Sequence, residues 1–276
     1  MILHFHKPDP TNLGDLLSNP FLYFNFENVS TYDIIEYNKT DPTDKHLVFG
    51  GGGLIGHRKM SPMIQHVSHH PGAKSVTFWG AGHNFKADEQ QLLYPDYLKR
   101  ADLIGIRDYI NQEDWVPCAS CMNSELDRSH VVTQDFVIYT HKKISMNLKN
   151  PQYPVMSNGA ENFKSIINFL GSAETVITNS YHGAYWSLLL GKRVKLFNWN
   201  IKFDYFREPL EFVDNIEAVA VEPFTKNDSI LELYRDRNRQ FAQRFAELIN
   251  APIVSCGPNS APIASLQSSS DTEPAS

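Results

Sequence analysis

Short apolar segments that end in glycine or in a polar turn recur along the first part of this chain. They read as strands and lie at residues 1–6, 47–49, 75–79 and 103–106. The stretches between them leave room for helices near residues 15–24, 60–70 and 86–99. An alternation of strand, turn and helix predicts a parallel sheet with helical crossovers. Because the strands are continuously apolar, the sheet should be covered on both faces.

A second series of the same kind follows a region of weaker pattern at residues 111–132. Its expected strands lie at residues 136–139, 175–178 and 194–197, with helices near residues 160–170 and 182–190. Asn227, Asp228 and Ser229 can cap a long last helix. We therefore predict two α/β domains, at residues 1–130 and 131–256, the second including the long final helix. The Ser-, Pro- and Ala-rich residues 257–276 predict a disordered tail.

Composition narrows the classes of protein that fit. The 276 residues carry a net charge of -6 without a basic stripe, which argues against a nucleic-acid-binding protein. No apolar run reaches the length of a membrane helix, and the first residues lack the apolar core of a signal peptide. Three cysteines are too few for a disulfide framework, so we expect a cytoplasmic protein with reduced thiols. An acidic chain can still bind anions where cationic groups gather in a cleft.

Four consecutive glycines, Gly50 to Gly53, follow the second predicted strand. Ligands of open α/β sheets bind beyond the carboxyl ends of the strands. Glycines allow the backbone to approach a ligand and to present N–H groups to an anion, so Gly51, Gly52 and Gly53 are candidate binding residues. The alternative is a tight strand-to-helix turn packed against the sheet, and both interpretations remain open.

The segment Thr178-Asn-Ser-Tyr-His-Gly183 follows an apolar strand and opens a helix. The amino end of a helix attracts an anion through its free N–H groups and its dipole. Asn179 or Ser180 can cap the helix, and His182 lies where it can donate or accept a proton. The alternative is that Ser180 is only a cap and that His182 is a structural histidine bonded to the backbone.

Asp15 and Arg107 also follow predicted strands. Asp15 is either a helix cap or a carboxylate that faces the cleft. Arg107 can bind a carboxylate or phosphate with its planar guanidinium, or it forms a surface ion pair with Asp108 that contributes little.

Two further clusters have the residue types of metal sites. Cys118 and Cys121 have a suitable spacing, but no second cysteine pair completes a zinc site, so we expect a buried structural pair. Three histidines share one face of a predicted helix, at His66, His69 and His70. We interpret them as part of a solvated helix face and predict no metal.

Taken in order, these motifs resemble the polysaccharide pyruvyl transferase family. The resemblance covers about residues 1–200 and lies in Asn12-Leu-Gly-Asp15, Gly50-Gly-Gly-Gly-Leu-Ile55, Gly80-Ala-Gly82, Ile106-Arg-Asp108, Thr178-Asn-Ser-Tyr-His-Gly183 and Leu188-Leu-Leu-Gly-Lys192. It implies two facing Rossmann-like domains, similar to the GT-B glycosyltransferases. It also implies transfer of a pyruvyl group from phosphoenolpyruvate to two hydroxyls of a sugar, as a ketal, in bacterial surface polysaccharide synthesis.

The resemblance also assigns roles to residues. His182 and Asp15 would be catalytic, and no metal or organic cofactor would be required. The acceptor would be a saccharide or a lipid-linked saccharide, with peripheral contact at the inner face of the membrane. The donor would be held by Gly51, Gly52, Gly53, Arg107, Asn179, Ser180 and Gly183.

One position departs from the family pattern. Many members have Arg-Leu-His where this chain has Ser180-Tyr-His182, and that arginine would hold the donor. Two alternatives therefore stay open. One is a glycosyltransferase that uses a nucleotide-activated sugar in the same cleft, and the other is a non-catalytic carbohydrate-binding subunit.

Overall fold

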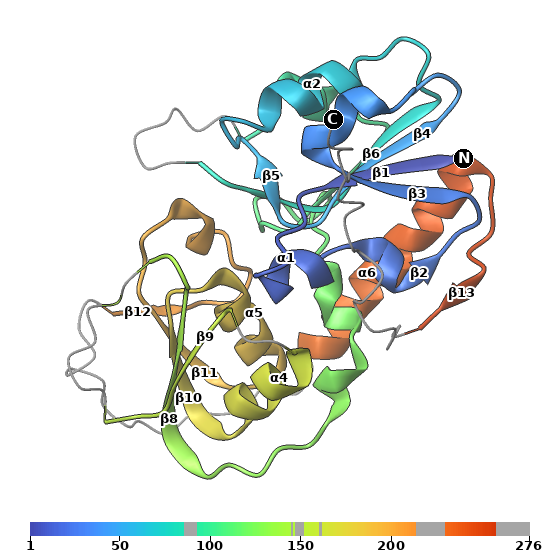
Figure 1. Cartoon of the computed structure of the whole chain (residues 1–276). Helices are drawn as coiled ribbons and strands as arrows, with labels where there is room; N and C mark the ends of the chain where they lie inside the picture. The colour runs from blue at the N-terminus through green and yellow to red at the C-terminus, as the bar shows by residue number, and fades with distance from the viewer. Residues whose placement is uncertain (86–92, 145, 147–151, 160–161, 214–229, 258–276) are drawn as a thin grey trace, which may run out of the picture.

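The apolar segments of the first hundred residues form one parallel sheet in the computed structural model (Figure 1), which describes residues 1–85, 93–144, 146, 152–159, 162–213 and 230–257. Its strand order is β3 (Val29–Asp33), β1 (Ile2–His6), β4 (His46–Gly50), β6 (Ser75–His83) and β5 (Gly53–Ile55), and β7 (Leu103–Ile106) also pairs with β6. Strands β1 and β6 are buried along their whole length, as expected for a sheet covered on both faces.

A second parallel sheet follows in the chain. Its order is β12 (Glu211–Phe212), β11 (Arg193–Leu196), β10 (Ala173–Thr178), β8 (Gln134–Thr140) and β9 (Val155–Ser157). A separate antiparallel pair joins β2 (Phe24–Asn25) to β13 (Ser255–Cys256). The expectation of an α/β fold with parallel sheets is therefore confirmed.

The helices lie between the strands of both series. The α-helices are α1 (Leu13–Leu17), α2 (Ser61–Ser68), α3 (Asp96–Lys99), α4 (Phe163–Gly171), α5 (Tyr181–Leu189) and α6 (Ile230–Ile249). Short 3-10 turns occur at Pro20–Leu22, Ile34–Lys39, Ala119–Met122, Ser124–Asp127 and Ile201–Phe203. Side chains of Asn12, Asn162 and Ser180 accept backbone N–H bonds at the starts of α1, α4 and α5. Within the described ranges, no helix combines the length and apolar character needed to cross a membrane.

Three local expectations differ from the structure. The helix expected near residues 15–24 is only the short α1, which is followed by the 3-10 turn Pro20–Leu22 and by β2. The four glycines do not lead into a helix, because positive φ angles at Gly51 and Gly52 turn the chain directly into β5. Strand β6 does not end at Gly80 but continues to His83, where β5 pairs with its last residues. The predicted tail at residues 258–276 and residues 86–92 of one predicted helix lie outside the described residues.

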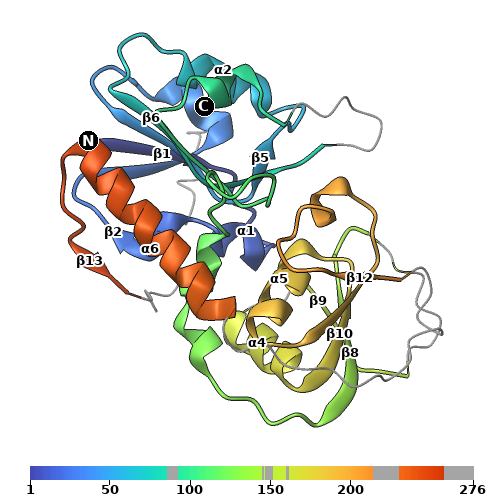
Figure 2. The same cartoon turned by 180° about the vertical axis from the view of Figure 1, so that it is seen from behind.

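The final helix lies against both halves of the chain (Figure 2). The rings of Phe241 and Phe245 pack on Trp79 of β6, at centroid distances of 5.2 and 5.6 Å. At the other end of α6, the ring of Tyr234 contacts that of Tyr185 in α5. The sequence assigns α6 to the second domain, but a large part of its apolar face is buried by the first. Long-range aromatic packing, which local patterns do not reveal, decides its position.

Candidate functional site

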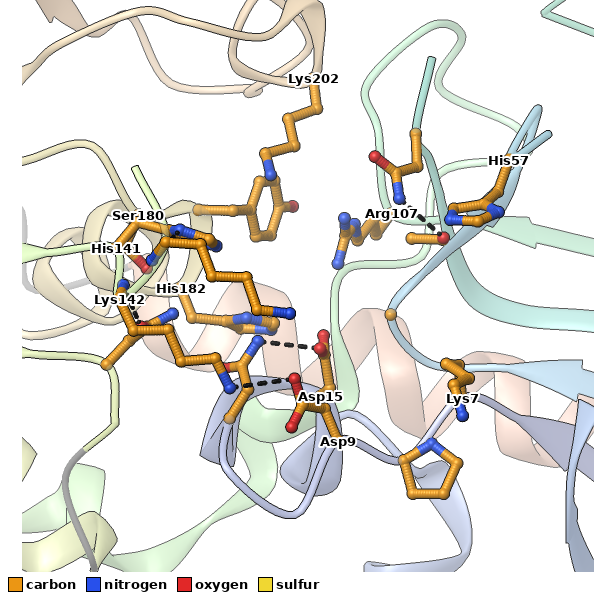
Figure 3. Close-up of a pocket in the computed structure, with 18 of the residues that line it drawn as sticks. Lys7, Asp9, Asp15, His57, Arg107, His141, Lys142, Ser180, His182 and Lys202 are labelled. Atoms are coloured by element: carbon orange, nitrogen blue, oxygen red, sulfur yellow. Dashed lines mark hydrogen bonds and ion pairs between the residues drawn. The ribbon is translucent and has the colours of Figure 1, made fainter. Parts of the chain in front are cut away.

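A cavity of about 520 Å³ lies where the carboxyl ends of the two parallel sheets meet (Figure 3). Its walls come from the loops after β1, β4, β6 and β7 of the first sheet and after β8, β9, β10 and β11 of the second. Helix α1 lies between the two sheets and contributes Asp15. The expectation that turns at strand ends converge on a common cleft therefore agrees with the observed geometry.

Cationic side chains outnumber carboxylates in this cavity. Five lysine and arginine side chains line it, against two aspartates, Asp9 and Asp15. Lys142 is paired with Asp9 at 3.0 Å, and Lys7 with Asp33 at 2.5 Å. The remaining positive charge belongs to Arg107, Lys143 and Lys202. An enclosed excess of positive charge favours an anionic ligand.

Arg107 is buried at the floor of the cavity. Its guanidinium carbon lies 3.9 Å from the ring centroid of Tyr181. Its Nε atom has no hydrogen-bond partner among the described residues, and the nearest oxygen of Asp108 is 3.8 Å away. Asp108 instead accepts hydrogen bonds from the backbone N–H and Nδ1 of His83. The alternative of an exposed Arg–Asp pair is therefore wrong, because Arg107 is buried and lines the cavity.

Lys202 comes from the 3-10 turn after β11 and points into the same cavity (Figure 3). Its ammonium nitrogen lies 4.6 Å from the ring centroid of Trp199. Burial, followed by the positive charge of Arg107, lowers the pKa of Lys202 to about 8. An anion in this cavity would offset both effects and favour the charged lysine.

Asp15 lies in the first turn of α1 and faces the cavity. The helix is capped by Asn12, which accepts the Gly14 N–H bond at 3.2 Å and donates to Asp15 Oδ2 at 2.8 Å. The interpretation of Asp15 as the cap is therefore wrong. Burial raises the pKa of Asp15, and the charge of Arg107 partly opposes that shift.

His182 is the second residue of α5 and also lines the cavity. Its ring packs on Trp186 at a centroid distance of 5.1 Å, and its Nε2 atom lies 3.6 Å from Cys118 Sγ. A Cβ atom on Gly14 would lie 2.1 Å from His182 Nδ1, so only glycine allows α1 this close. Burial and the nearby Arg107 charge lower the pKa of His182, which keeps the ring neutral at pH 7. Within the part of the chain that the structure describes, the His182 ring bonds the Cys118 thiol and no backbone group.

The other predicted donor-binding residues separate into two groups. Gly52, Gly53 and Ser180 line the cavity, and Ser180 Oγ also accepts the Gly183 N–H bond that caps α5. Three others lie beside the cavity without lining it. Gly51 packs against Ser18, and Gly183 against Tyr139 and Thr178. Asn179 accepts the His141 N–H bond and donates to the Ile144 carbonyl, so it organises a loop that the predicted role did not include.

Sequence motifs miss several residues that line the cavity. Lys7, Asn84 and Asn158 directly follow β1, β6 and β9, and His141 and Lys142 directly follow β8. The signal that could have found them is their place in the chain, because each is among the first polar residues after an apolar strand. Lys202 is harder to find, since a loop separates it from β11.

The cysteine and histidine clusters have different surroundings. Cys118 and Cys121 are buried free thiols, and Cys118 contacts His182. On the predicted histidine face, His66 packs against Tyr37, while His69 bonds Gln65. No group of three potential metal ligands occurs among the residues that the structure describes.

Comparisons with known proteins identify no activity. No protein-family model matches the chain, and no curated protein matches it. A solved structure of a functionally uncharacterized protein from Klebsiella pneumoniae is similar over 74% of this chain and 85% of its own, with 16% sequence identity and a TM-score of 0.47.

Proposed function

We propose that this chain is a transferase of the polysaccharide pyruvyl transferase type, which takes a group from an anionic donor to a saccharide. The observation that carries the proposal is the convergence of Arg107, His182 and Asp15 in a cavity with excess positive charge. The family resemblance predicted these three residues from separate motifs. A non-catalytic carbohydrate-binding subunit does not need a buried guanidinium beside a histidine and a carboxylate of raised pKa.

The proposed architecture is two Rossmann-like domains that face each other, as in the GT-B glycosyltransferases. Two parallel sheets whose carboxyl ends border one cavity support that arrangement. The proposed location is the cytoplasm, with acceptors that include lipid-linked saccharides at the inner face of the membrane.

With phosphoenolpyruvate as donor, two sugar hydroxyls form bonds to the central carbon, and the bond from that carbon to the phosphate oxygen breaks. One hydroxyl proton goes to the methylene carbon and the other to the departing phosphate. Arg107 and Lys202 are placed to hold phosphate and carboxylate oxygens. Asp15, whose pKa is raised by burial, can accept a proton from a hydroxyl, and His182 can assist proton transfer. No metal or organic cofactor enters this scheme.

Another cationic side chain in the cavity can replace the arginine that many family members have at the position of Ser180. Ser180 brings no charge there, but Lys202 reaches the same cavity from another loop. Cationic charge for an anionic donor is therefore available without that arginine. This supports the proposal but leaves the donor open.

The second candidate is a glycosyltransferase that uses a nucleotide-activated sugar. Trp199 favours it, because this ring lines the cavity and remains 37% exposed. An exposed aromatic face can stack on a base or a sugar ring.

Thermal unfolding with separate ligands distinguishes the candidates. A ligand at 100 times its Kd stabilises a protein by about 2.7 kcal/mol, which raises its Tm measurably. Phosphoenolpyruvate should raise the Tm of the native protein and not that of an Arg107→Gln variant. A rise with nucleotide sugars only would identify the glycosyltransferase. No rise with either ligand, followed by a rise with oligosaccharide alone, would favour the binding subunit.

A further inference from the structure

A chain of buried polar groups lies beneath His182 and is not used by the proposed chemistry. The Trp186 Nε1 atom donates to Ser120 Oγ at 3.0 Å. Ser120 Oγ lies 3.2 Å from Cys118 Sγ, which in turn lies 3.6 Å from His182 Nε2. All four side chains are buried, so water cannot replace these partners. The chain ends on the ring that faces the cavity.

The direction of this chain follows from what each group can donate. An indole N–H only donates, so Ser120 Oγ is an acceptor toward Trp186 and its own proton is free to bond Cys118 Sγ. With the Ser120 hydroxyl as donor to the sulfur, the S–H proton is left for the remaining partner, His182 Nε2.

The thiol keeps the proton that this arrangement requires. Burial raises the pKa of Cys118, so the neutral S–H form is present at pH 7. The Tyr185 hydroxyl donates to the Cys118 carbonyl at 2.7 Å and holds the backbone in place. The sulfur is therefore fixed under one nitrogen of the imidazole ring.

We propose that Cys118 is a positioning residue that holds neutral His182 as the tautomer with its proton on Nδ1. A neutral imidazole has one N–H, so a nitrogen that accepts the thiol proton leaves the other nitrogen as the donor. The Nδ1 side of the ring faces Gly14 of α1, next to Asp15 and the cavity.

The tautomer limits what His182 can do in the reaction, and this step of the argument rests on the proposed function. In this tautomer His182 presents a hydrogen-bond donor to an oxygen of the ligand and cannot accept a proton at Nδ1. It would therefore act as a hydrogen-bond donor toward the departing group. Proton acceptance from the sugar hydroxyl would then fall to Asp15. The tautomer itself does not depend on any activity.

Long-range ¹H–¹⁵N NMR correlation on the unliganded, ¹⁵N-histidine-labelled full chain tests the inference. The signals of His182 are those missing from the spectrum of His182→Gln. We expect a protonated-type shift for Nδ1 and an unprotonated-type shift for Nε2 in the native protein. Cys118→Ala removes the donor and should move both shifts toward the opposite tautomer, whereas Cys118→Ser keeps a donor and should retain the native pattern.

Cys121→Ala is the matched control, because Cys121 is a buried thiol of the same turn that bonds Asn238 and not His182. It should leave the His182 shifts unchanged. A proton on Nε2 in the native protein, or an unchanged pattern in folded Cys118→Ala, would overturn the inference. The native spectrum decides even where a variant does not fold. A native Nδ1–H pattern together with full transfer activity in His182→Ala would instead overturn the proposed catalytic role of His182 alone.

Discussion

Lys202 carries a charge that depends on pH within an accessible range. Burial and the charge of Arg107 lower its pKa to about 8, so the ammonium loses its proton between pH 7 and pH 9. A bound anion favours the protonated form, and binding should therefore weaken as the pH rises through this window. If only the protonated form binds, the Kd rises about tenfold from pH 7 to pH 9. Titration calorimetry with sulfate, which remains a dianion from pH 7 to pH 9, measures this change.

Two variants separate Lys202 from the other cations of the cavity. Lys202→Met should bind sulfate weakly at both pH values, with a nearly flat pH dependence. Lys143→Met removes a more exposed cation of the same cavity and should retain the slope of the native protein. An equally steep slope in Lys202→Met would show that another group titrates.

At the scale of residues, motifs found the groups that follow strands directly and have distinctive chemistry. Asp15, Arg107 and His182 were predicted and line one cavity. Lys142 and Lys202 were not predicted, because a lysine in a loop resembles any solvated lysine until the loop is placed in space. Their role arises from burial and neighbouring charge, which depend on the tertiary fold.

At the scale of elements, Ser180 combines the cap of α5 with a place in the cavity wall. Ser180→Ala removes the bond to the Gly183 N–H and should lower the free energy of unfolding by about 1 kcal/mol. Ser180→Asp retains a cap acceptor and suits the helix dipole, so stability should be kept. The added negative charge should nevertheless weaken anion binding.

Denaturant unfolding and phosphate titration measure these two effects separately. Ser165→Ala, an exposed serine within α4, is the control and should change stability by less than about 0.5 kcal/mol. Unchanged stability in Ser180→Ala would contradict the capping role. Unchanged phosphate affinity in Ser180→Asp would place the anion elsewhere in the cavity.

Elements were predictable from sequence where a local pattern decides them. Strands β1, β4, β6, β7, β8, β10 and β11, together with α2, α4 and α5, lie near their predicted positions, whereas the five-residue strand β3 was not predicted. Strand β5 was missed because Gly51 and Gly52 turn the chain back onto the sheet, and three residues are too few to show a strand pattern. The pairing of β2 with β13 was also missed, since its two strands are separated by most of the chain.

At the scale of the whole molecule, one feature of the site was predictable. Ligands of open parallel sheets bind beyond the carboxyl ends of the strands, and the strand ends of both sheets border one cavity. The path of α6 does not follow from any local rule. Its helical spacing predicts an apolar face, but that face packs on Trp79 of the first sheet as well as on Tyr185 of the second half. Because α6 contacts both halves, its packing should contribute to the stability of the molecule as a whole.

Phe245 tests this coupling most directly. Its ring is fully buried among Trp79, Phe21 and Phe26, so Phe245→Ala should lower the free energy of unfolding by about 3–5 kcal/mol. Leu248→Ala, on the same helix but 39% exposed, should cost about 1 kcal/mol or less. Urea unfolding followed by tryptophan fluorescence and by circular dichroism measures both. If the fluorescence and circular dichroism transitions coincide in the native protein but occur at different urea concentrations in Phe245→Ala, then α6 holds the two sheets in one cooperative unit. Equal losses in the two variants would mean that the aromatic contacts with the first sheet contribute little, and the position of α6 would then need another cause.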